Sequence, residues 1–523
     1  MGLLLCFMKG RYVGWALAGL LGAAGVVGIL SASPHGIGLS PDSIVYVGGA
    51  RNILAGNGFS MPPGNEPITH HAPLYPLVLA ILGFGGLEPV QGARFLGALL
   101  FGLNILLIYK LATHVVGERT PIPAWIPIGV SGFTLFARPM WEIHLMAWSE
   151  PMFISLCLAT VCVMAGYVRT LRRSWLLAGG LSISLSILTR YAGLSMWAAC
   201  CLIVLFTGDR PIRRRLSDTF AFSDVSLAPF ALWVGRNILA GGAATERSLV
   251  FHPIGPDHLR EALVTAASWL LVPAQARGWT KAAALALVGA GMAAGIYLVF
   301  RQEHKNTSRA FLAVVPPVVK VAGICAAVYV LFLAFSISFV DGNIPLDQRI
   351  LSPLFVMLLL CIAYGFYMWD QATGKPRVAR ALSAVLISAA ILGNLESSSS
   401  LFKQSYIQGL GLNNLHWHHS ELIRKLRELQ VPGKIYSNSP PAIYYHAGKG
   451  ASKIPVPFSK VTRRPNPYHQ LQLSAMYKDM DHGGLLVLFD LGSIDSTLDA
   501  AGLVRDLKLS PFAVYADGAM YTR

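Results

Sequence analysis

The sequence predicts an α-helical polytopic membrane protein of about eleven transmembrane helices, followed by a small C-terminal α/β domain outside the cytoplasm. Three observations support this fold class. Of the 523 residues, 54% are hydrophobic and 13% are charged, a composition too apolar for an ordinary soluble protein. The apolar residues form successive runs, many of them long enough to cross a bilayer. From about residue 400 the composition becomes that of a soluble domain.

The chain has a net charge of +16, and the positions of its basic residues predict its orientation in the membrane. Lys and Arg residues gather in short clusters between the apolar runs, and the densest contains Arg213, Arg214 and Arg215. Such clusters mark the cytoplasmic side of a membrane protein. They all fall on that side if the N-terminus is cytoplasmic and the C-terminal domain extracytoplasmic. We therefore predict an integral protein of a bacterial inner (plasma) membrane, with the lipid bilayer as a partner and no nucleic acid.

The first apolar run, residues 12–30, follows Lys9 and Arg11 and is long enough to span the membrane. Ser31-Ala32-Ser33 after it resembles a signal-peptidase site. We favour an uncleaved anchor over a signal peptide, because the run is longer than a usual signal core and many further spans follow.

The external loop 32–92 begins with a helix signal. Ser40 can cap a helix whose first residue is Pro41, and Gly56 can end it in the left-handed conformation. This predicts an amphipathic helix of about four turns that places Asp42 at the boundary between lipid and water. The residues expected to rest on the bilayer are Ile44, Val45, Ile53 and Leu54.

Apolar runs and basic clusters predict the remaining course of the chain. A short apolar segment, 70–82, reads as an interfacial or re-entrant helix. The further spans are 94–108, 123–136, 152–168, the two halves of a hairpin 175–206, 220–234, 282–300, 318–339, 350–369 and 382–395. A second external loop covers 138–151, and a third, 241–279, contains a predicted interfacial helix at 257–271.

Residues 1–400 are therefore assigned to a transmembrane domain and 401–523 to an extracytoplasmic α/β domain. In the second domain, residues 434–437 and 485–489 read as strands, and 512–515 with 520–522 as a terminal hairpin. Helices are predicted at 421–429 and 497–507.

Charged residues next to the membrane boundaries point to a site on the outer face, since ionisable groups near membrane depth are costly. They are Asp42, Glu142, Glu150, Arg190, Arg236, Asp341, Asp347 and Arg349. Arginines can hold a lipid phosphate while a carboxylate removes a proton from an attacking hydroxyl. Because nucleotide sugars are not supplied outside the cytoplasm, a transferase there needs a donor on a lipid carrier.

Several motifs in the first 360 residues or so carry a family resemblance. Asp42 follows the first span and precedes Gly56-Asn57-Gly58-Phe59 and Pro73-Leu74-Tyr75-Pro76-Leu77. Later motifs are Trp148-Ser149-Glu150-Pro151, Leu188-Thr189-Arg190, Trp233-Val234-Gly235-Arg236-Asn237 and Asp347-Gln348-Arg349-Ile350-Leu351-Ser352-Pro353. Together they resemble the GT-C class of membrane glycosyltransferases, in the branch of protein O-mannosyltransferases and lipid A aminoarabinose transferases (glycosyltransferase family 39-like).

The resemblance implies an inverting transfer of a sugar from a polyprenyl-phosphate donor to an envelope glycan, glycolipid or protein. It implies that Asp42 is the general base or the group that orients the acceptor, that Glu150 assists at the acceptor or a metal, and that arginines bind the donor phosphate. Those arginines are Arg349, Arg190 and Arg236. The residues expected to line the substrate cavity are Tyr46, His70, His71, Tyr75, Glu142 and Asp347. Ser43 follows Asp42 where protein mannosyltransferases carry a second acid, so the acceptor and the sugar stay open.

No metal site is predicted, although a divalent cation at Glu150 stays an alternative. All seven cysteines lie in apolar stretches, so neither disulfides nor a cysteine-rich metal site is expected. His416, His418 and His419 beside Trp417 are interpreted as polar loop residues, with a metal site as the alternative.

Simpler roles compete with the catalytic ones. Asp42 could serve only the helix dipole, Glu150 only a helix start, and the arginines only as anchors that reach the lipid headgroups. Two other function classes also remain: a transporter or flippase, and a non-catalytic envelope assembly protein.

Overall fold

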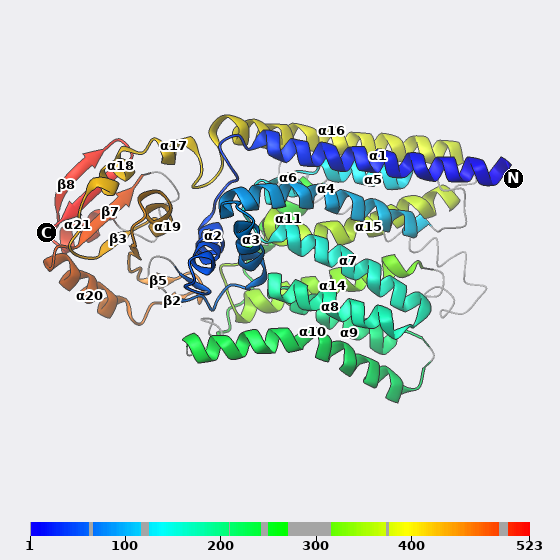
Figure 1. Ribbon diagram of the computed structural model, residues 1–523, viewed down its shortest axis with the longest axis horizontal. Coiled ribbons are helices and arrows are strands. Elements are labelled where there is room, and N and C mark those ends of the chain that lie inside the picture. The colour runs from blue at the N-terminus through cyan, green and yellow to red at the C-terminus, as the bar shows by residue number, and fades with distance from the viewer. Residues whose placement is uncertain are drawn as a thin grey trace.

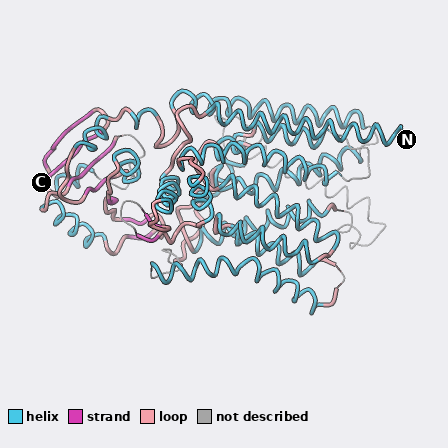
Figure 2. The backbone as a smooth tube through the Cα atoms, viewed as in Figure 1, coloured by secondary structure: helices cyan, strands magenta, loops and turns pink. Residues whose placement is uncertain are grey.

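The computed structural model is an elongated molecule in which a long helical bundle carries a smaller α/β unit at one end (Figure 1). The structure describes residues 2–61, 66–116, 125–208, 210–241, 249–269, 315–372, 376–490 and 500–523. The N-terminus lies at the opposite end of the bundle from the α/β unit. Strands gather in and beside that unit, whereas the bundle is helical (Figure 2).

The bundle is that of an integral membrane protein. Its helices are α1 (Gly2–Ala32), α4 (Pro89–Val116), α5 (Trp125–Phe136), α7 (Glu150–Thr170), α8 (Arg173–Thr189), α9 (Gly193–Phe206), α10 (Ile212–Gly241), α14 (Pro317–Phe339), α15 (Gln348–Ala372) and α16 (Pro376–Gln408). In the described part of the chain, six of these are long and apolar enough to cross a bilayer: α1, α4, α7, α14, α15 and α16. Phe101, Phe153 and Tyr167 are fully buried in the core that α4 and α7 share, whereas Leu20 on α1 and Leu392 on α16 are exposed. Such exposed leucines suit contact with lipid.

The two ends of the bundle differ as the charge pattern predicts. The α7–α8 and α9–α10 turns, next to the basic clusters, lie at the end that holds the N-terminus (Figure 1). The α8–α9 turn lies at the other end (Figure 1). It begins with Arg190, the residue that directly follows α8. The predicted span 282–300 lies outside the described residues, so the number of about eleven spans stays a prediction.

Four shorter helices lie toward the end of the bundle that faces the α/β unit. They are α2 (Pro41–Leu54), α3 (Leu74–Phe84), α6 (Arg138–His144) and α11 (Pro256–Ser268). The capping prediction for α2 is confirmed, because the Ser40 side chain accepts from the backbone N–H of Ser43 and Gly56 has a positive φ of 80°. The prediction that the apolar face of α2 rests on the bilayer is wrong for Ile44 and Val45. Both are buried within the protein, where α2 packs on α3 and α4.

The α/β unit contains a five-stranded sheet of order β4-β3-β7-β9-β8. Its strands are β3 (Ile435–Ser437), β4 (Ser452–Lys453), β7 (Leu485–Phe489), β8 (Ser510–Tyr515) and β9 (Gly518–Thr522). β3 pairs in parallel with β4 and β7, while β7, β9 and β8 are antiparallel. The strand predictions at 434–437 and 485–489 and the terminal hairpin are confirmed.

Other elements of this end are short. The helices are α17 (Leu415–His418), α18 (Glu421–Glu428), α19 (Pro440–Ala442), the π-helix η1 (Ile443–Ala447), α20 (His469–Asp481) and α21 (Ala500–Asp506). Two small hairpins are also present. They are β1 (Ser60–Met61) with β2 (Glu66–Pro67), and β5 (Phe458–Ser459) with β6 (Arg464–Pro465). Helix α16 continues past residue 400 to Gln408, so the sheet-bearing part begins later than the change in composition suggests.

Three distant segments meet directly before α2. Gly38 pairs with Met146, and Leu39 pairs with Gly411. The Asn413 side chain donates to the carbonyl oxygens of His35 and Ile37, each at 3.0 Å. The start of α2 is therefore held both by the loop before α7 and by the segment that enters the α/β unit.

Candidate functional site

Four charged residues lie close together, and each stands at or directly next to the end of a helix. Asp42 is the second residue of α2, Glu150 the first of α7 and Arg349 the second of α15, while Arg190 directly follows α8. The local sequence sets these ends. Prolines stand in the first turns of α2 and α7, where a missing N–H costs nothing, and Arg190 adopts an extended backbone that stops α8.

The four side chains form one ion-pair cluster. Arg190 and Arg349 both donate to the Oε1 atom of Glu150, and Arg349 Nη2 also lies 2.7 Å from Asp42 Oδ2. Arg349 therefore bridges the two acids. We call these residues, Asp42, Glu150, Arg190 and Arg349, the charge cluster.

The members of the charge cluster differ strongly in burial. The Glu150 side chain is 1% exposed, Arg349 17%, Arg190 19% and Asp42 38%. Glu150 is thus a buried counter-ion for two guanidinium groups, a geometry that costs less than burying one charge alone. Asp42 is the member that solvent or a ligand reaches most easily.

Polar and aromatic neighbours fix the arginines further. Arg190 donates to Ser149 Oγ at 3.3 Å, and the Tyr46 hydroxyl lies 3.4 Å from the same oxygen. The guanidinium carbon of Arg349 lies 4.5 Å from the centre of the Trp148 ring. The Trp148 indole N–H donates to Ser40 Oγ at 2.7 Å, which joins this ring to the cap of α2.

The electrostatic surroundings act on three groups outside the membrane spans. Burial raises the pKa of Asp42, but the nearby Arg349, with His71 and Arg190, lowers it more, so the net direction is down. Burial and then the Asp42 charge raise the pKa of Tyr46 to about 12. Burial and the neighbouring His70 lower the pKa of His71 to about 3, so this imidazole is neutral at physiological pH.

The predicted aromatic lining residues surround Tyr46. The rings of His71 and Tyr75 lie 5.0 and 5.3 Å from the Tyr46 ring, both edge-on, and the His70 ring lies 4.3 Å from that of His71. These four predicted cavity residues are thus brought together beside Asp42.

Arg236 lies in a different environment from the other two arginines. Its guanidinium donates to the backbone carbonyls of Phe59 at 2.7 Å and Ile68 at 2.9 Å, and it lies over the Trp233 ring. Arg236 therefore joins the end of α10 to the 59–68 loop. The structure does not place it in the charge cluster.

Glu142 and Asp347 form a second acidic region. Glu142 faces Arg138, one turn earlier, at 3.7 Å, and Asp347 accepts from the backbone N–H of Ile350 at 2.9 Å. Burial raises the pKa of both acids, and the charge of Asp347 adds to the rise at Glu142. Neither is part of the charge cluster as defined by its ion pairs.

Metal binding finds little support. In the described ranges, no group of three or more His, Cys, Asp or Glu residues is placed to hold an ion. At Glu150, two guanidinium groups already occupy Oε1, and their positive charge would oppose a cation there.

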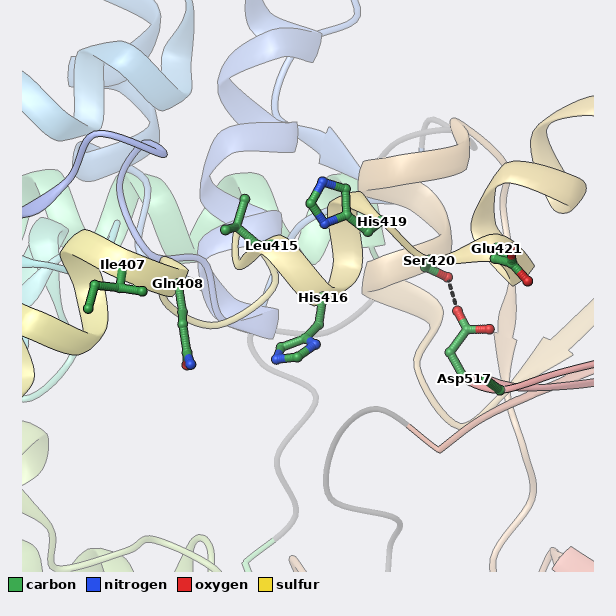
Figure 3. A pocket seen from close by; sticks show the side chains of 9 residues that line it. Ile407, Gln408, Leu415, His416, His419, Ser420, Glu421 and Asp517 are labelled. Atoms are coloured by element: carbon green, nitrogen blue, oxygen red, sulfur yellow. Dashed lines mark hydrogen bonds between the residues drawn. The ribbon is translucent and has the colours of Figure 1, made fainter.

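The histidines around α17 lie apart from the charge cluster. His416 and His419 line a cavity of about 510 Å³ with Ser420 and Asp517, whose side chains are hydrogen bonded to each other (Figure 3). The two imidazoles point in different directions in Figure 3, and His418 is bonded to Asn413. This arrangement suits the interpretation as polar loop residues.

Three further residues lie at or next to the charge cluster but are not among the candidate site residues that the sequence predicts. They are Trp148, Ser149 and Ser40. The signal was present in part, because Trp148 and Ser149 directly precede Glu150 and Ser40 caps the helix of Asp42. What the sequence does not show is that Trp148 lies against Arg349, 201 positions later in the chain.

Comparisons with known proteins support the fold. No family model matches the sequence, and no curated protein does. The structure of ArnT from Cupriavidus metallidurans bound to undecaprenyl phosphate is similar at a TM-score of 0.55 and 13% identity, covering 96% of this chain and 97% of that one. Apo ArnT gives 0.53 and 13%, covering 99% and 97%. The arabinofuranosyltransferase AftD from Mycobacteria gives 0.50 and 14%, covering 97% of this chain and 39% of its own. The chain thus has the fold of GT-C membrane glycosyltransferases, as the sequence motifs predicted.

Proposed function

We propose that this protein is a glycosyltransferase that moves a sugar from a polyprenyl-phosphate donor to an envelope acceptor on the extracytoplasmic face. The observation that carries the proposal is the charge cluster, which puts an accessible carboxylate 2.7 Å from an arginine at one end of a membrane bundle. The similar ArnT structure contains undecaprenyl phosphate, a ligand of the proposed donor class. The acceptor is a glycolipid, a polysaccharide or a protein.

In this proposal Asp42 is the general base. It takes the proton of the acceptor hydroxyl, whose oxygen forms a bond to the anomeric carbon of the sugar. The bond between that carbon and the phosphate oxygen breaks, and the electron pair leaves with the phosphate. Attack from the side opposite the phosphate inverts the anomeric configuration.

Arg349 and Arg190 stabilise the leaving phosphate, on which negative charge grows in the transition state. The charge cluster holds two acids and two guanidinium groups, so it has no spare positive charge before the donor binds. An incoming phosphate competes with Asp42, the exposed partner of Arg349, more readily than with buried Glu150. Arg349 therefore exchanges Asp42 for the phosphate, and the freed carboxylate turns to the acceptor.

Glu150 has a positioning role in this scheme. It holds both guanidinium groups through Oε1 at the start of α7, so they stay in place while the phosphate enters and leaves. A fixed array of donors needs no reorganisation during the reaction, which is the main advantage of such preorganised sites.

The first experiment compares envelope glycans and glycolipids from cells with and without the gene, to identify the product. The second measures transfer by the purified Asp42→Asn variant, in which we expect at least about a hundredfold loss because a positioned base contributes that much or more. The matched control is Asp257→Asn. Asp257 also follows a proline in the first turn of a helix, α11, but is exposed and outside the cluster.

Two outcomes would contradict the proposal. If Asp42→Asn and Asp257→Asn behave alike with full transfer, Asp42 serves only its helix. If the gene is needed for envelope assembly but Asp42→Asn restores it fully, the protein is an assembly factor or a flippase.

A further inference from the structure

Trp148 contacts one member of the charge cluster, Arg349, and also the residue that caps the helix of another member, Asp42. One face of its ring supports the guanidinium of Arg349, with 4.5 Å between ring centre and guanidinium carbon. Its indole N–H donates to Ser40 Oγ at 2.7 Å. Ser40 caps α2, and Asp42 stands two residues further on.

Both contacts have a clear physical basis. An aromatic face attracts a guanidinium group, and an indole N–H that is partly buried needs an acceptor. Ser40 is a fixed acceptor, because it also forms a capping box in which Ser43 N–H donates to Ser40 Oγ and the Ser40 backbone N–H donates to Ser43 Oγ at 3.0 Å. Trp148 thus links Arg349 rigidly to the first turn of α2.

We propose that Trp148 is a positioning residue that sets the separation between Asp42 and the Arg349 guanidinium during sugar transfer. This inference rests on the proposed function. In the resting site, Asp42 and Arg349 hold each other directly, at 2.7 Å. When the donor phosphate replaces Asp42, that contact is lost, whereas the two contacts of Trp148 involve neither carboxylate and persist.

The consequence is geometric. Asp42 and Arg349 come from segments 307 positions apart, so once their ion pair opens their spacing depends on the remaining contacts between these segments. A displacement of about 1 Å at a reacting group is enough to cost about a hundredfold in rate. The Trp148 ring keeps the base and the phosphate-binding group at a fixed spacing.

Two variants separate the two contacts. Trp148→Phe keeps an aromatic face for Arg349 but removes the N–H, so kcat should fall about tenfold with the donor KM unchanged. Trp148→Leu removes both contacts, so the donor KM and the dissociation constant for undecaprenyl phosphate should also rise about fivefold.

A double-mutant cycle tests the link through Ser40. Ser40→Ala removes the acceptor of the same hydrogen bond, so adding Trp148→Phe to it should cause little further loss of kcat. The matched control is Trp141→Phe, because the Trp141 N–H donates instead to Leu135 O, away from the cluster. That variant should keep kcat.

The readouts distinguish a positioning role from a structural one, since a merely structural Trp148 would lower the yield or the thermal midpoint and leave kcat of the folded protein unchanged. If Trp148→Phe keeps wild-type kcat, or if the cycle is additive, the inference is wrong. Asp42→Asn, measured alongside, separates the two proposals. Loss of transfer in Asp42→Asn with silent Trp148 variants overturns only the role of Trp148, whereas transfer that survives Asp42→Asn overturns the proposed function itself.

Discussion

Two carboxylates that bind the same arginine have opposite environments. Glu150 is buried and contacts both guanidinium groups, whereas Asp42 is more than a third exposed and contacts one. Burial with two cations suits a fixed counter-ion, and exposure with one cation suits a group that changes partner. The proposed division between a positioning acid and a reacting acid follows from this asymmetry.

The pH dependence of transfer should report the Arg349–Asp42 contact. In the proposed mechanism transfer needs ionised Asp42, so kcat/KM should fall as the pH drops through the pKa of this carboxyl, which its surroundings lower. Arg349→Gln removes the strongest of these lowering influences and leaves burial, which raises the pKa. We therefore expect the acid limb of the kcat/KM profile to move to higher pH.

The same shift, smaller in size, is expected for Arg190→Gln, because Arg190 also lowers the pKa of Asp42 but does not contact it directly. This second variant keeps the measurement possible if Arg349→Gln is too slow. Arg51→Gln at the other end of α2 is the control, since Arg51 pairs with Glu88. An acid limb that stays in place or moves to lower pH would show that Asp42 is not the titrating base.

At the scale of elements, the sequence predicts what neighbouring residues determine but not the contacts between distant segments. The Ser40-Pro41 start and the Gly56 end of α2 depend on neighbouring residues, so the sequence was sufficient to predict them. The burial of Ile44 depends on α3, α4 and the α/β unit, which no local pattern reveals. The sequence pattern, a helix with apolar residues beside a membrane, therefore predicts contact with lipid instead.

The arginines show the same limit. Arg190, Arg236 and Arg349 all stand near the outer ends of predicted spans, so the sequence treated them alike. Their partners differ: two share a carboxylate, whereas Arg236 donates to backbone carbonyls of the 59–68 loop. Backbone carbonyls have no residue-specific signature in a sequence.

The junction before α2 leads to a prediction about Gly411. This residue has a φ of 58°, and a Cβ atom there would lie 2.1 Å from the Leu39 carbonyl oxygen. Gly411→Ala should therefore lower the free energy of unfolding by about 3 kcal/mol, through backbone strain and displacement of the pairing with Leu39. The thermal unfolding midpoint in detergent measures the effect.

Gly448→Ala is the matched control. Gly448 has a similar φ of 66° but open space where a Cβ would stand, so only the conformational cost of about 1 kcal/mol applies. Equal shifts in the two variants would show that the contact with Leu39 does not matter.

At the scale of the whole molecule, one loop of the α/β unit reaches back to the bundle. Arg463 donates from Nε to the Gly342 carbonyl at 2.9 Å, and Gly342 N–H donates to the Val461 carbonyl at 2.8 Å. Arg463 Nη2 also lies 3.1 Å from His258 on α11. Gly342 belongs to the loop that leads into Arg349, so the α/β unit contacts the segment that carries the arginine proposed to bind the donor phosphate.

Arg463→Ala should loosen this loop. We expect faster hydrogen exchange in residues 341–347 and a several-fold lower transfer rate, with the thermal midpoint of the bundle nearly unchanged. Arg464→Ala is the control, because Arg464 is the exposed neighbour on the small β5–β6 hairpin. Unchanged exchange in 341–347 would mean that the contact does not restrain the loop.

The sequence predicts that an α/β unit follows the helical part of the chain, but it does not predict this contact. The break in composition and the strand patterns are local, whereas Arg463 and Gly342 are 121 positions apart and carry no complementary charge. The overall fold was thus within reach of the sequence, while the coupling between its two parts was not.

The clamp of Asn413 on the backbone at His35 and Ile37 also bears on how the protein is made. The start of α2 is synthesised long before Asn413, so a growing chain cannot form this contact until that residue has been made. Until then the start of α2 lacks this support, although Glu150 and both arginines of the charge cluster are already part of the chain. The contacts that support the start of α2, and with it Asp42, are therefore completed only once the C-terminal part of the chain is being made.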